Sequence, residues 1–168
     1  MKYHNITHDD MLNGDGIRVV VWVSGCEHHC KGCQNPLTWH PDVGKDFEAA
    51  EFDEIAKELS KSYVSGITFS GGDPLHPANR HAVLNLIQAI HQCFPDKTVW
   101  IYTGYTWEDV VNDKTMRDII YLIDVLVDGK FEEGKQNNQF HWAGSTNQRV
   151  VDVQKTIKEG RLILHESN

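Results

Sequence analysis

The stretch IRVVVWVSGCEHHCKGC, residues Ile17–Cys33, joins an apolar segment to a loop that contains three cysteines. Its first nine residues are β-branched or aromatic almost throughout, which is typical of a strand buried on both faces of a parallel sheet. The cysteines begin where this strand ends. Cys26, Cys30 and Cys33 follow a C-x3-C-x2-C spacing, so three thiolates of one loop can reach a single small inorganic centre.

Apolar strand patterns and helical patterns alternate along the rest of the chain. The sequence predicts strands at 66–74, 98–105 and 124–129, helices at 52–59, 83–94 and 107–123, and two later strands at 148–153 and 161–165. This alternation indicates an α/β fold with mostly parallel strands. A closed eight-stranded barrel typically needs about 250 residues. The 168 residues of this chain are therefore expected to form one domain, 1–168, built as a partial, open-sided (β/α) barrel.

The unusual residues fall at the ends of the four main predicted strands. GCEHHCKGC follows the first strand, SGGDP the second, TGY the third and DGKF the fourth. In parallel α/β folds the carboxyl ends of the strands lie along one edge. We therefore expect these four turns to converge on one site.

Charge and composition limit the classes of partner. The formal net charge of -8 and the pI near 5.6 argue against a nucleic-acid partner, which normally requires clustered Lys and Arg. The sequence has no apolar run of about 18 residues and no N-terminal signal pattern, so we expect neither a membrane partner nor export. A cytoplasmic protein with clustered thiols is expected to use them for metal or redox chemistry and not for disulfides.

The cysteine spacing alone leaves three kinds of chemistry open. A structural zinc site normally has four protein ligands in two separated pairs, and this sequence has no second pair. Thiol-disulfide catalysis would use the CKGC segment but would leave Cys26 without a role. A 4Fe-4S cluster usually has four cysteine ligands, so three cysteines would leave one iron open to a substrate.

The cysteine loop and the SGGDP segment, Ser70–Pro74, together resemble the radical S-adenosylmethionine (SAM) superfamily. In that superfamily the open iron binds the methionine part of S-adenosylmethionine, and a glycine-rich turn meets its amino group. Two features differ from the common superfamily pattern: Gly32 before the third cysteine, where an aromatic residue is frequent, and Asp73 after the two glycines, where Glu is frequent.

Both differences are also found in the activase family of anaerobic ribonucleoside-triphosphate reductases, which the chain resembles over nearly its whole length. The resemblance includes NGDGIR (residues 13–18), YTGY (102–105), VLVDGKF (125–131) and GSTNQR (144–149). It implies a radical SAM type of partial barrel. It also implies reductive cleavage of S-adenosylmethionine at a 4Fe-4S cluster, after which the 5'-deoxyadenosyl radical takes a hydrogen from a reductase glycine to form a glycyl radical. The implied partners are the reductase, as protein substrate, and a reduced flavodoxin-like electron donor.

The resemblance also assigns the site residues. Cys26, Cys30 and Cys33 are the expected cluster ligands, and the expected S-adenosylmethionine contacts are Gly32, Cys33, Gln34, Gly71, Gly72, Asp73 and Thr103, with Gly104 as a further candidate. No catalytic residue beyond cluster and cofactor is expected. Two alternatives stay open, an activase of another glycyl-radical enzyme of the pyruvate formate-lyase type and a non-catalytic zinc-binding module.

Other polar residues receive weaker predictions. His28 and His29 are not expected to be ligands, because these clusters prefer thiolates. Cys93 is predicted to be a small core residue on an apolar helical stripe. The roles of four residues are left open: Asp128 and Lys130 lie at the expected active edge, and Asn147 and Arg149 belong to GSTNQR, which either binds the partner or is a structural loop.

Overall fold

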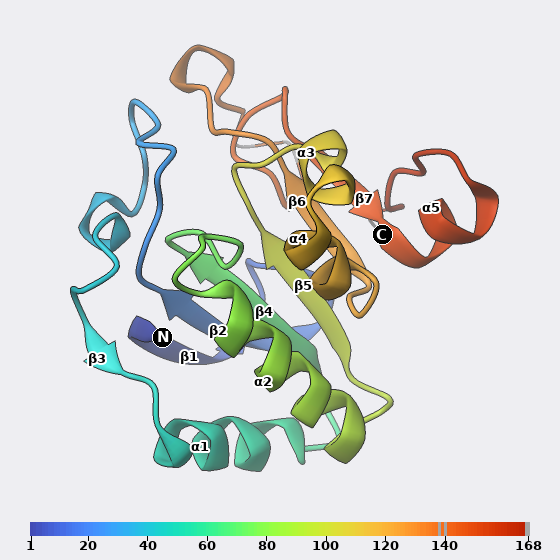
Figure 1. Ribbon diagram of the computed structural model, residues 1–168. Coiled ribbons are helices and arrows are strands. Elements are labelled where there is room, and N and C mark those ends of the chain that lie inside the picture. Colours follow the sequence, from blue (N-terminus) through green and yellow to red (C-terminus); the bar gives the residue numbers. More distant parts are fainter. Residues whose placement is uncertain (138, 140, 167–168) are drawn as a thin grey trace.

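The computed structural model describes residues 1–137, 139 and 141–166, which form a mixed α/β fold (Figure 1). The strands are β1 (Lys2–Asp10), β2 (Ile17–Val23), β3 (Lys45–Asp46), β4 (Val64–Gly71), β5 (Thr98–Tyr102), β6 (Val125–Asp128) and β7 (Arg149–Asp152). The helices are α1 (Ala49–Leu59), α2 (Arg80–Cys93), α3 (Trp107–Asn112), α4 (Lys114–Ile120) and α5 (Val153–Glu159), with short 3-10 turns at Pro36–Thr38 and Glu133–Lys135.

Among the described residues the strands form one seven-stranded sheet with the order β3-β1-β2-β4-β5-β6-β7. Strands β2, β4, β5 and β6 run parallel to one another, whereas β1, β3 and β7 pair in the antiparallel sense. The sheet is not closed, since β3 and β7 are its two edges. The predicted α/β fold with a mostly parallel sheet is thus confirmed in its central strands.

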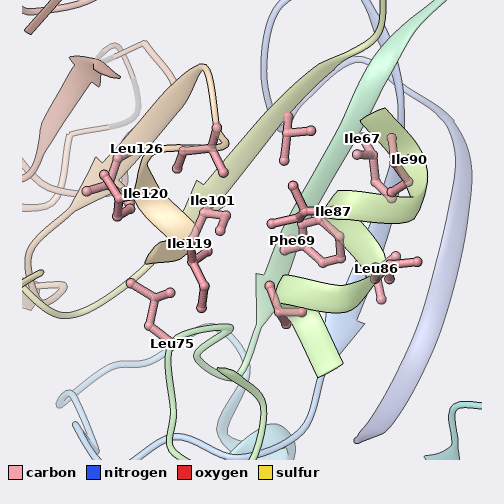
Figure 2. Packing of buried hydrophobic residues seen from close by; sticks show 14 of the residues in the cluster. Ile67, Phe69, Leu75, Leu86, Ile87, Ile90, Ile101, Ile119, Ile120 and Leu126 are labelled. Atoms are coloured by element: carbon pink, nitrogen blue, oxygen red, sulfur yellow. The ribbon is translucent and has the colours of Figure 1, made fainter. Parts of the chain in front are cut away.

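The two faces of the sheet have different compositions, because successive side chains of a strand point to opposite faces. On one face, Val99 and Ile101 of β5 belong to the main core, which the helices cover. Figure 2 shows this packing, with Phe69 of β4 against Ile87 of α2. On the other face, Trp100 belongs to a separate small cluster with residues of β6 and β7. Within the part of the chain that the structure describes, the helices cover one face only, and Trp142 and Ala143 pack on the small cluster of the other face.

Local capping decides where the helices begin. Glu48 and Glu51 form a capping box at the start of α1. The single helix predicted at 107–123 is wrong, because Asp113 adopts an extended conformation and its side chain accepts from two backbone N–H groups at the start of α4. The segment predicted as one helix therefore forms two helices, α3 and α4. None of the described helices has the length and apolar character needed to cross a bilayer.

Three further details differ from the sequence predictions. Strand β1 was not expected; it is polar, and it is held by its pairing with β2 and by a 2.8 Å hydrogen bond from Trp22 Nε1 to Thr7 Oγ1. The strand predicted at 161–165 is wrong, since this segment forms only an isolated bridge between Leu164 and Val151. Cys93 is exposed instead of buried, because it is the last residue of α2, beyond the last buried position at Ile90.

Candidate functional site

The carboxyl ends of β2, β4, β5 and β6 border a cavity of about 250 Å3. Nearly all the site residues predicted from the sequence line it: Cys26, Cys30, Cys33, Gln34, Gly71, Gly72, Asp73, Thr103 and Gly104. Gly32 belongs to the same loop but is not part of this lining. A Cβ at Gly32, where φ is +73°, would lie 3.0 Å from Glu133 Oε1, so this glycine faces a neighbouring loop.

Backbone hydrogen bonds fix the base of the cysteine loop. The N–H groups of Gly25 and Cys26 donate to the carbonyl oxygens of Thr38 and Trp39 at 2.7 and 2.8 Å. These bonds tie the residues just after β2 to the 3-10 turn that follows the third cysteine. The loop therefore leaves and re-enters the body of the protein at neighbouring points, and its three partly buried thiols face the same cavity.

Backbone N–H groups point at two of the three sulfurs. Burial raises the pKa of the Cys26 thiol to about 11, and the backbone N–H groups of His28 and His29 act in the opposite direction. The N–H of Asn35 donates to Cys33 Sγ at 3.3 Å. Such donors favour thiolate over thiol, and hydrogen bonds to cluster sulfurs tune reduction potentials. Cys26 and Cys33 thus have backbone donors of the kind that cluster sulfurs accept, although burial has the larger effect on the pKa of Cys26.

Within the described ranges, no three His, Cys, Asp or Glu side chains are grouped as ligands of one metal ion would be. A zinc site would need a fourth ligand such as His28. Its Nε2 already lies 2.7 Å from Asp73 Oδ2. With His28 Nε2 engaged by Asp73, the three thiols that line the cavity fit a thiolate-ligated cluster with one iron left free.

The SGGDP turn is packed directly against the end of β2. The N–H groups of Gly72 and Asp73 donate to the carbonyl oxygens of Val23 and Gly25 at 2.8 and 2.7 Å. A Cβ on Gly72 would lie 2.6 Å from that same Gly25 oxygen. The second glycine is therefore required for contact between two chain segments, in addition to any approach of a ligand.

The carboxylate of Asp73 connects several parts of the site. It accepts hydrogen bonds from the N–H groups of Leu75 (2.8 Å) and Gly104 (3.0 Å) and from Thr103 Oγ1 (2.9 Å). His28 Nε2 lies 2.7 Å from it, and the His28 and Asp73 side chains are only 6% and 2% exposed. Sequence reasoning missed this pair; the only signal was that both residues follow strands predicted to end at the same edge.

The four residues whose roles the sequence left open form contacts within the chain. Arg149 donates from Nε to Asp128 Oδ1 at 3.0 Å and from Nη2 to Glu108 Oε2 at 2.8 Å. These bonds raise the pKa of Arg149, and the hydrogen bonds from the guanidinium lower the pKa of Glu108 to about 2. Asn147 Nδ2 donates to the Lys130 carbonyl oxygen at 2.8 Å. The GSTNQR segment therefore fastens β7 to the turn after β6.

Comparison with known proteins gives the class of this chain. Residues 12–151 match the family described as a "4Fe-4S single cluster domain". The chain is therefore an iron-sulfur protein of the single-cluster type, and the match includes all three cysteines of the loop.

Curated relatives give the particular family. The chain is 41% identical to a protein of Enterobacteria phage T4 over 89% of this chain and 93% of the relative, and 41% identical to one of Vibrio cholerae over 89% and 97%. A protein of Escherichia coli K12 is 40% identical over 89% and 97%. Each is named "Anaerobic ribonucleoside-triphosphate reductase-activating protein". The chain belongs to this family.

Proposed function

We propose that this chain activates an anaerobic ribonucleoside-triphosphate reductase as a radical SAM enzyme. The observation that carries the proposal is that the three thiols of one loop and the SGGDP turn line the same cavity. When bound, a 4Fe-4S cluster and S-adenosylmethionine would supply reductive cleavage of the sulfonium to a 5'-deoxyadenosyl radical, which takes hydrogen from a reductase glycine and leaves a glycyl radical. One domain, 1–168, would perform this as an open-sided, partial (β/α) barrel.

The proposed roles follow from where the residues lie. Cys26, Cys30 and Cys33 would hold the cluster through their thiolates. Gln34, Gly71, Gly72 and Thr103 line the rest of the cavity and would border the S-adenosylmethionine, together with Cys33.

Two of the predicted contacts have special positions. The carboxylate of Asp73 already has hydrogen-bond partners within the protein. It would therefore act on the cofactor indirectly, by fixing the turn and the nearby backbone. Gly32 would act through the shape of the loop, since its missing side chain faces Glu133.

The open sheet suits a protein substrate. Helices cover only one face of the sheet, and the cavity lies at the strand ends, where a loop of a second protein can approach it. This access supports the reductase as the proposed protein substrate. The other proposed properties are a reduced flavodoxin-like donor, a cytoplasmic location and no nucleic acid or membrane partner.

The decisive experiment is to mix the anaerobically reconstituted protein with reductant, S-adenosylmethionine and the reductase, and to record the electron paramagnetic resonance spectrum. We expect a glycyl radical that depends on all components. A brown protein that gives this signal only with a pyruvate formate-lyase type of partner would identify the alternative activase, and a colourless protein that contains zinc would refute the iron-sulfur assignment.

Substitution of one ligand tests the site itself. Cys30→Ala should lose the visible absorption of the cluster and all glycyl radical formation, because one of three thiolate ligands is missing. Cys93→Ala is the matched control, since Cys93 is exposed at the end of α2. This variant should keep the visible absorption and the glycyl radical formation of the wild type. A complete cluster in Cys30→Ala would overturn the ligand assignment.

A further inference from the structure

His28 lies in the cysteine loop, yet its side chain binds to two other turns. Its Nε2 is 2.7 Å from Asp73 Oδ2, and its ring lies directly over Gly104, where an added Cβ would come within 2.3 Å of His28 Cδ2. The ring also meets the Tyr105 ring edge-on at 4.6 Å, and the Tyr105 hydroxyl donates to Glu27. A side chain between the first and second cysteines is thus enclosed by the turn after β5.

One carboxylate links His28 to the rest of the site. Asp73 belongs to the turn after β4 and also accepts from Thr103 and from the N–H of Gly104, which belong to the turn after β5. The backbone bonds at Gly25 and Cys26 hold only the base of the cysteine loop. His28 therefore fixes the middle of the loop to both turns at once.

The neighbouring histidine provides a contrast. His29 is exposed and has a left-handed backbone conformation with φ of 47°. Its ring packs edge-on against Trp39 at 4.8 Å, on the return segment of the same loop. Two adjacent histidines thus make different contacts, one across the site and one within the loop.

We propose that His28 is a positioning residue that sets the separation between the cluster and the bound S-adenosylmethionine; this inference rests on the proposed function. The cluster would move with the cysteine loop, whereas the part of S-adenosylmethionine that Gly71, Gly72 and Thr103 border would move with the turns after β4 and β5. Because a misplacement of about 1 Å can slow a reaction by about a hundredfold, a rigid connection between these segments is required. The His28 to Asp73 bond supplies that connection.

The experiment compares anaerobically reconstituted holoproteins. His28→Ala should keep the iron and sulfide content of the wild type, because all three cysteine ligands remain. Its dissociation constant for S-adenosylmethionine should rise on the order of tenfold, because the cysteine loop and the two turns are no longer held at a fixed separation. The change that S-adenosylmethionine causes in the electron paramagnetic resonance spectrum of the reduced cluster should also be lost.

Three further variants make the interpretation specific. His28→Gln keeps an N–H donor and should restore binding to within about threefold of wild type, since it can still reach the carboxylate. Gly104→Ala should reproduce the defect of His28→Ala, because the new Cβ displaces the ring. His29→Asn is the matched control, as Asn tolerates the left-handed conformation, and it should bind like the wild type.

The outcomes separate this inference from the proposed function. Equal S-adenosylmethionine affinity and equal spectra in wild type and His28→Ala would overturn the inference alone. Loss of cluster in both His28→Ala and His28→Gln would also overturn it, because His28 would then support the loop itself. A wild-type holoprotein that does not bind S-adenosylmethionine would overturn the proposed function and this inference with it.

Discussion

Replacing Arg149 by Met should lower the free energy of unfolding by about 2 to 3 kcal/mol at pH 7. Asp128 is 1% exposed and is paired with Arg149, which also holds Glu108. Without the guanidinium, Asp128 would keep the N–H of Trp107 at 2.6 Å as its remaining donor. Breaking a buried pair costs about 3 to 5 kcal/mol, and we reduce this value because the Arg149 side chain is 33% exposed.

The loss should also depend on pH. Hydrogen bonds from Arg149 lower the pKa of Glu108 from its ordinary 4.5 to about 2. A depressed carboxyl pKa stabilises the fold above the unfolded pKa, and this stabilisation disappears as the pH falls through the folded pKa. The free energy of unfolding of the wild type should therefore fall by about 1 kcal/mol between pH 4.5 and 2, and Arg149→Met should not show this fall. The value is small because the Glu108 side chain is 61% exposed.

Urea unfolding of the cluster-free protein at several pH values measures both effects. Arg161→Met is the matched control, because Arg161 pairs with Glu159 at the surface and its loss should cost less than about 1 kcal/mol. If Arg149→Met cost less than about 0.5 kcal/mol at pH 7 while reductase activation failed, the intramolecular role would be refuted, and Arg149 would instead contact the partner.

Two further substitutions test the turns that shape the site and the helices. Gly71→Ala should cost about 2 kcal/mol or more in urea unfolding, since φ is +98° and the new Cβ would lie 2.9 Å from the Trp22 backbone; an unchanged midpoint would contradict this. Asp113→Ala should cost about 1 to 2 kcal/mol at pH 7 through loss of the α4 cap. Hydrogen bonds from Thr115 and Met116 lower the pKa of Asp113 to about 2, so the difference from wild type should vanish as the pH falls from about 4 to 2. A difference that persisted at pH 2 would show that the carboxylate charge is not responsible.

The parallel strands were predictable because each is an apolar run followed by a distinctive turn. The convergence of the cysteine loop, SGGDP and TGY at one edge followed from that topology, and the cavity contains all but one of the predicted site residues. Strand β1 was not predictable from its polar composition, since its place depends on pairing with β2. The break between α3 and α4 depends on one Asp side chain that competes with the continuing helix.

The contacts across the site could not be predicted from residue types. His28 and Asp73 are 45 positions apart, and an isolated histidine in a loop gives no indication of its partner. Only the order of β2, β4 and β5 in the sheet brings the two side chains together. Arg149 and Asp128 were likewise recognisable as polar residues at strand ends, but their mutual pairing depends on the antiparallel register of β6 and β7, in which they lie opposite one another.

The separation of the two faces of the sheet affects how this protein would withstand oxygen. The apolar layer beneath the helices contains none of the three cysteines of the loop. The packing of the body of the fold therefore does not include the residues that would bind the cluster. Small zinc domains, by contrast, unfold when their metal is removed. Oxidative loss of iron should therefore disturb the cysteine loop more than the sheet and the helices packed on it.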